Sequence, residues 1–157
     1  MAGSLLARAR FMAALAFRVA RRAVPTPAKS DYDSEDLIEA IMTGDVELLD
    51  SYGIGLSSAR HTTGTPWFFI ALECGNLSAI NWFLSHGADP CAPDQSGRLP
   101  LETIVQRASL ADEMDEHLPD CAAMARALIS HGAKLSARTI QGETLSERAA
   151  ALGLTLL

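Results

Sequence analysis

The feature that most constrains this chain is a four-residue string that occurs twice. Ser-His-Gly-Ala begins at Ser85 and again at Ser130, 45 residues later. Gly97 and Gly142 share that spacing, whereas Gly64 and Gly97 lie 33 residues apart. The difference of 12 residues predicts one insertion into a repeat with a period of 33 residues. Internal repeats of this period are typical of stacked architectures, in which each unit packs against its neighbours along the chain.

Composition favours a helical fold. The chain has 157 residues, of which 48% are hydrophobic and only 6% are aromatic. Most of the buried volume must therefore come from Ala, Leu and Ile, which suits closely packed helices better than a β-sandwich. The length and polarity are those of one globular domain. The sequence has no apolar run of about 18 residues, so it predicts no membrane-spanning helix.

The repeated glycines introduce segments similar to the first half of the ankyrin repeat, Gly-x-Thr-Pro-Leu-His-x-Ala-Ala-x-x-Gly. Residues 64–75 read Gly-Thr-Pro-Trp-Phe-Phe-Ile-Ala-Leu-Glu-Cys-Gly, and residues 142–153 read Gly-Glu-Thr-Leu-Ser-Glu-Arg-Ala-Ala-Ala-Leu-Gly. Residues 97–102 and 37–44 are weaker matches in the same register. Residues 34–157 therefore resemble the ankyrin-repeat family. The resemblance implies an all-α solenoid of helix-turn-helix units with short β-turn fingers.

The period divides the body into units at residues 34–63, 64–96, 97–141 and a partial unit at 142–157. Counting back from the period places the insertion at residues 109–120, between the two helices of the third unit. It holds five acids and no base, and is either a binding loop or a solvated loop without a role.

The sequence also departs from the family pattern. The position of the family's histidine holds Ile38, Phe69, Glu102 and Glu147 in the four units. We therefore expect the hydrogen bonds of that histidine to be absent or replaced.

The N-terminal segment has a different character from the body. Residues 1–30 carry six basic residues and no acid, and their five arginines fall within an arc of about 160° on a helical wheel. Pro25 and Pro27 end this pattern, so we predict an amphipathic helix over 5–23 within an arm and linker at residues 1–33. The segment resembles a mitochondrial transit peptide. The alternative is a basic tail that binds an anionic membrane surface or an acidic protein.

The charge of residues 31–157 limits the classes of partner that the folded part can bind. Residues 31–157 carry 7 basic and 19 acidic residues, a net charge of −12. This balance argues against nucleic-acid binding by the folded part, because phosphates would be repelled. RNA contact through the arm is the remaining route to nucleic acid.

We find no motif for catalysis, a cofactor or a metal. Cys74, Cys91 and Cys121 form no Cys-x-x-Cys pair, and the sequence holds no Gly-Lys-Ser/Thr phosphate loop. His86 and His131 occupy equivalent positions of the repeated string, which predicts turn histidines rather than ligands. Asn76 begins an Asn-Leu-Ser string, which we interpret as a helix cap. An enzyme that uses one of the cysteines is the alternative of a different class.

The resemblance to ankyrin repeats implies a contact surface of finger tips and inner helices, at about residues 56–67, 90–98 and 134–141. Trp67 and Trp82 are either interface anchors or core residues. The candidate partner-binding residues are Arg8, Arg10, Arg18, Arg21, Arg22, Trp67, Trp82, Pro93, Asp94, Arg98 and Arg138.

These observations predict a non-catalytic protein–protein interaction module. Together with the arm, they predict an accessory or structural subunit of a larger mitochondrial assembly, such as a respiratory, ATP-synthase or ribosomal complex. The alternative is a free cytosolic or secreted adaptor or regulator that binds one protein partner. Since a repeat fold serves many partners, the fold alone does not decide between them.

Overall fold

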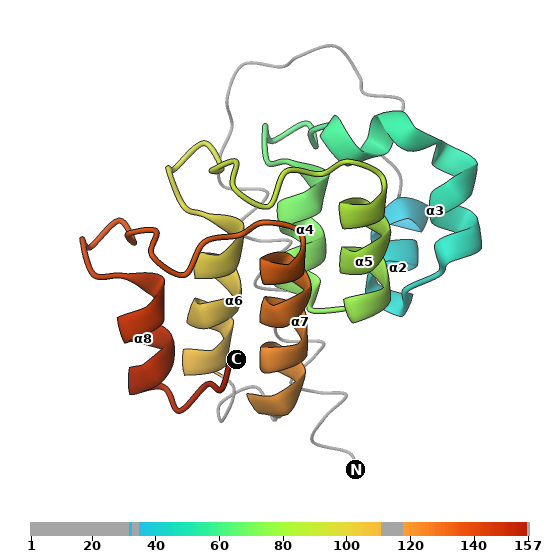
Figure 1. The fold of residues 1–157 in the computed structure, drawn as a ribbon. Coiled ribbons are helices and arrows are strands. Elements are labelled where there is room, and N and C mark those ends of the chain that lie inside the picture. The colour runs from blue at the N-terminus through green and yellow to red at the C-terminus, as the bar shows by residue number, and fades with distance from the viewer. Residues whose placement is uncertain (1–31, 33–34, 111–117, 157) are drawn as a thin grey trace.

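The computed structural model describes residues 32, 35–110 and 118–156. This part of the chain contains seven α-helices and one 3₁₀-helix (Figure 1). They are α2 (Glu35–Thr43), α3 (Val46–Tyr52), η1 (Ile54–Ser58), α4 (Trp67–Cys74), α5 (Leu77–Ser85), α6 (Pro100–Ser109), α7 (Leu118–Ser130) and α8 (Leu145–Ala151). Its extended pairing is limited to two isolated antiparallel bridges. The predicted all-α fold class is confirmed.

The helices form two rows that follow the order of the chain. α2, α4, α6 and α8 pack side by side in the first row, and α3, α5 and α7 form the second. α2 packs on α3, α4 on α5 and α6 on α7, so each pair spans both rows. The loops that lead from each pair to the next project from one edge of the stack, toward the top and left of Figure 1.

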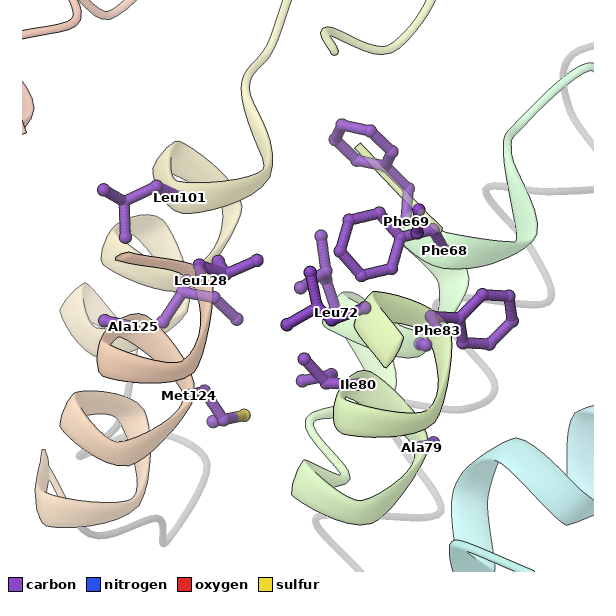
Figure 2. Packing of buried hydrophobic residues seen from close by; sticks show 14 of the residues in the cluster. Phe68, Phe69, Leu72, Ala79, Ile80, Phe83, Leu101, Met124, Ala125 and Leu128 are labelled. Atoms are coloured by element: carbon purple, nitrogen blue, oxygen red, sulfur yellow. The ribbon is translucent and has the colours of Figure 1, made fainter. Parts of the chain in front are cut away.

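The core runs through the middle of both rows. All six residues from Trp67 to Leu72 are buried, so the first two turns of α4 are enclosed on every side. Figure 2 shows Leu72 and Ile80 of the second pair pointing toward Leu128 of the third pair. No single pair could bury this surface alone, and the stacking of neighbours therefore supplies the apolar burial that stabilises the chain.

Each helix pair also caps the first helix of the pair before it. Gly44 and Gly75 end α2 and α4 with φ of +72° and +70°, a left-handed conformation that glycine adopts without strain. The Asn76 side chain donates to the carbonyl of Met42 at 3.1 Å. One pair further on, the Arg107 guanidinium donates to the carbonyls of Glu73 and Cys74. Helix ends without partners of their own are thus satisfied across the stack.

The third pair differs in detail from the sequence-based boundaries. α7 begins at Leu118, so residues 118–120 of the predicted insertion belong to a helix rather than to a loop. Pro119 lies in the first turn, where a helix tolerates proline because those N–H groups have no intrahelical acceptor. At the other end of the predicted insertion, Ser109 is the last residue of α6 and Leu110 caps that helix. Residues 111–117 lie outside the described residues, as does the segment for which the amphipathic helix is predicted.

The last unit has one helix, α8, followed by a short non-helical segment that packs against the rest of the chain. Leu154 and Leu156 are buried after α8 ends, and the Arg126 guanidinium of α7 donates to the Thr155 carbonyl at 3.2 Å. These residues cover part of the second row where the earlier units place a helix.

Candidate protein-interaction surface

Three equivalent turns, which we call the fingers, lie at residues 60–66, 93–99 and 138–144. In each, a backbone N–H near the start of the turn donates to a carbonyl four residues on. The pairs are His61 to Thr65 (2.8 Å), Asp94 to Arg98 (2.9 Å) and Thr139 to Glu143 (2.8 Å). The glycine inside each turn has φ between +81° and +91°. The same backbone geometry therefore recurs at intervals of 33 and 45 residues.

The first and third fingers are braced by an arginine of their own. The Arg60 guanidinium donates to the Gly64 carbonyl at 2.9 Å, and the Arg138 guanidinium donates to the Gly142 carbonyl at 2.6 Å. Both arginines are exposed. Arg138 was among the predicted contact residues and Arg60 was not. The sequence does mark Arg60, because it lies four residues before the glycine of its finger, as Arg138 does.

The second finger is fixed to the first-row helix beside it. The Asp94 carboxylate accepts from the backbone N–H groups of Ser96 (2.8 Å) and Arg98 (3.0 Å). The Arg98 guanidinium pairs with Glu73 of α4 at 2.8 Å and lies 6.0 Å from the centre of the Phe69 ring. Asp94 and Arg98 thus hold the finger in place, so much of their hydrogen-bonding capacity is already used within the chain.

The third finger is tied to α6 by Glu102, which is 9% exposed. One carboxylate oxygen accepts from the backbone N–H of Ile140 at 3.3 Å, and the other lies 3.4 Å from the N–H of Leu99. Glu102 stands where the family pattern has histidine. At this position the side chain is a carboxylate, and it accepts hydrogen bonds from two backbone N–H groups.

The tips of the fingers supply the surface that remains open. Gln95, Ser96, Ile140 and Gln141 are exposed, and Ile140 is 61% exposed. The Gln95 side chain also lies against Gly64 of the neighbouring finger. The first two fingers are therefore in contact, and the third projects from the same edge of the stack (Figure 1). Pro93 is exposed at the base of the second finger.

Both tryptophans lie in the core. Trp67 is fully buried and packs edge-on against the His61 ring, with centroids 5.1 Å apart. Trp82 is 4% exposed, donates its indole N–H to Asp50 at 2.5 Å and stacks on the His86 ring at 4.1 Å. Of the two alternatives for these residues, the core interpretation is the one that fits the structure, because neither ring faces solvent.

The smaller predictions can also be placed. Asn76 caps α5 by accepting from the Ala79 N–H at 3.2 Å, as expected. His86 and His131 each donate from Nδ1 to the carbonyl four residues earlier, at 2.7 and 2.9 Å, as turn histidines should. The arm residues Arg8, Arg10, Arg18, Arg21 and Arg22 lie outside the described residues.

The cysteines differ in environment. Burial raises the pKa of the Cys74 thiol to about 12, with Arg107 partly opposing the shift. This thiol is protonated at neutral pH, whereas a nucleophile must be a thiolate. Cys121 is buried, and Cys91 is exposed with its sulfur 3.2 Å from the Gly132 carbonyl oxygen.

Within the described ranges, no three metal-binding side chains cluster together. No helix in this part of the chain is long and apolar enough to cross a membrane. A comparison with protein-family models matches none of them, and a comparison with curated proteins finds no significant match.

Proposed function

We propose that the chain is a non-catalytic protein–protein interaction module of the ankyrin-repeat type, which binds another protein through the row of fingers. The observation that carries the proposal is the recurrence of one finger geometry, in register, along a single edge of a two-row helical stack. Rigid backbone that presents exposed loop tips is the usual way in which a repeat scaffold offers a binding surface.

The chemistry of the tips indicates the kind of contact. Amide, hydroxyl and aliphatic side chains at Gln95, Ser96, Ile140 and Gln141 suit a mixed polar and apolar protein surface. Asp94 and Arg98 act behind this row by fixing the second finger, and Glu102 fixes the third. A rigid finger loses little conformational entropy on binding, which favours affinity.

We assign this module to an accessory or structural subunit of a larger mitochondrial assembly, of the respiratory, ATP-synthase or ribosomal kind. The support is the sequence of residues 1–30, with six bases and no acid, which is typical of segments addressed to that organelle. The alternative, a free cytosolic or secreted adaptor, uses the same fingers without the organellar address.

The test is affinity purification from fractionated cells of the tagged full chain and of a version that begins at Asp31. The proposal predicts that the full chain co-purifies stoichiometrically with a mitochondrial complex and that the shortened version does not. Recovery of one cytosolic partner by both versions would favour the adaptor. Failure of both to recover any stoichiometric partner would contradict the interaction module itself.

A further inference from the structure

Three large apolar side chains are exposed on two neighbouring helix turns at the edge opposite the fingers (Figure 1). Met42, Val46 and Leu77 are 40%, 39% and 38% exposed. They flank the two turns that join α2 to α3 and α4 to α5, which lie side by side because Asn76 hydrogen-bonds the Met42 carbonyl and lies against Gly44. We call these three residues the turn patch. Clustered apolar side chains of this kind mark binding sites more often than isolated ones do.

The turn patch lies in an acidic setting. Glu39 lies on α2 one turn before Met42, Glu47 follows Val46, and both are exposed. Asp45 and Asp50 of the same region are exposed as well. Helices α2, α3, α4 and α5 contain no lysine or arginine. The Arg107 side chain of α6 reaches Gly75 in the α4–α5 turn, but it is buried and its guanidinium is hydrogen-bonded to the carbonyls of Glu73 and Cys74. An occupant of the turn patch must therefore combine apolar side chains with positive charge.

One segment of this chain has that chemistry. Residues 5–23 hold five arginines and no acid, together with Leu5, Leu6, Phe11, Met12 and Phe17. The 11 residues from 24 to 34 separate this segment from α2 and span up to about 36 Å when extended. α2 has nine residues and is thus about 14 Å long. The tether therefore reaches the turn patch, at the far end of α2.

We propose that the turn patch is the docking site for the chain's own basic N-terminal segment, residues 5–23. The tether places this segment at an effective concentration of about 1 mM. An intrinsic dissociation constant of about 0.1 mM then suffices to keep it bound about nine-tenths of the time. An external acidic partner or anionic surface would have to displace the segment from the turn patch. The contact does not involve the fingers, so it is independent of partner binding through them, although it uses the same segment that supports the mitochondrial assignment.

Paramagnetic relaxation in the full chain tests the proposal. A spin label is attached to Ala13→Cys in a Cys91→Ser background, in which the remaining cysteines are the partly buried Cys74 and the buried Cys121. The amide signals of Val46 and Leu77 should lose at least about half of their intensity, whereas that of Ile140 in the third finger should not change. Full intensity at Val46 and Leu77, or equal loss at Ile140, would overturn the proposal.

Charge reversal gives the matched control. Glu47 and Asp120 are exposed acids in the first turns of α3 and α7. Glu47→Lys combined with Glu39→Lys should restore the signals, and Asp120→Lys should leave the loss intact. If the signal loss instead persists in the Glu39→Lys/Glu47→Lys variant and disappears in Asp120→Lys, the segment binds elsewhere and the proposal is overturned. A second sample mixes spin-labelled chains without ¹⁵N and ¹⁵N-enriched chains without the label. Loss of signal intensity at Val46 and Leu77 in this mixture would show a contact between copies and would also overturn the proposal.

Discussion

At the scale of single residues, the structure rests on side chains that complete the backbone of a neighbouring unit. Asn76 could be predicted as a cap, because its acceptor role is local to α5. Its second role, at the Met42 carbonyl, could not, since the two residues lie 34 positions apart. The bond from Ile140 to Glu102 lies within one unit, but it joins residues 38 positions apart and was not predictable either. Sequence patterns report local capping well and contacts between units poorly.

Gly75 should be the most sensitive of the helix-ending glycines. Gly75→Ala imposes φ near +70° on a residue with a side chain and drives its Cβ into the Arg107 guanidinium. We expect a loss of about 2–4 kcal/mol in the free energy of unfolding, from left-handed strain and displacement of that cap. Gly153 is the matched control, because its φ is +69° with nothing near a new Cβ.

Urea unfolding measures both variants. Gly153→Ala should cost about 1 kcal/mol, which is the conformational strain alone. Equal losses for the two variants would show that the contact with Arg107 contributes nothing.

Cys74 gives a prediction about pH. Burial raises the pKa of the Cys74 thiol from 9.0, the value of the free group, to about 12 in the folded chain. Because the unfolded chain releases this proton first, the stability that the neutral thiol contributes is complete below pH 9 and declines as the pH rises toward 12. Wild type should therefore lose more stability between pH 8 and pH 10 than Cys74→Ala does. Parallel losses in urea unfolding would contradict the shift.

At the scale of elements, the helices were the most predictable part and their ends the least. The units differ in helix length, since α3 has seven residues and the equivalent α5 has nine. The insertion was predicted to separate the two helices of the third unit, but α7 already begins at Leu118. The repeat period shows where residues are inserted and does not show which of the inserted residues are helical. The fingers were predicted in position, but the arginine braces at Gly64 and Gly142 were not.

The contact between the first two helix pairs can be dissected at Asn76. Asn76→Ala removes both the cap of α5 and the donor to the Met42 carbonyl, and should cost about 1–2 kcal/mol. Asn76→Asp keeps the capping acceptor and loses the donor, so it should cost less. Asn81→Ala, at an exposed position of the same helix, should change the stability by less than about 0.5 kcal/mol. Identical unfolding midpoints for all three variants would refute the bridging role.

At the scale of the whole molecule, a two-row stack exposes one edge of fingers and one edge of helix turns (Figure 1). The order of the units followed from the repeats, because the spacing of their glycines is a property of sequence alone. The residues that form the exposed surface could not be predicted from the sequence. Trp67 and Trp82 are buried in the core, and Arg98 is paired with Glu73. Of the predicted contact residues that the structure describes, Pro93 and Arg138 are exposed, and both lie in the fingers.

The most direct test of the central claim changes one exposed apolar residue at a finger tip and one exposed apolar residue elsewhere. Ile140→Asp places a charge on the third finger, and Leu110→Asp places one at the end of α6, where the side chain is 41% exposed. The proteins recovered with each tagged full-length chain are then quantified by mass spectrometry. We predict a stoichiometric partner that wild type and Leu110→Asp retain and that Ile140→Asp loses at least about ten-fold. Equal recovery by all three chains would contradict binding through the fingers.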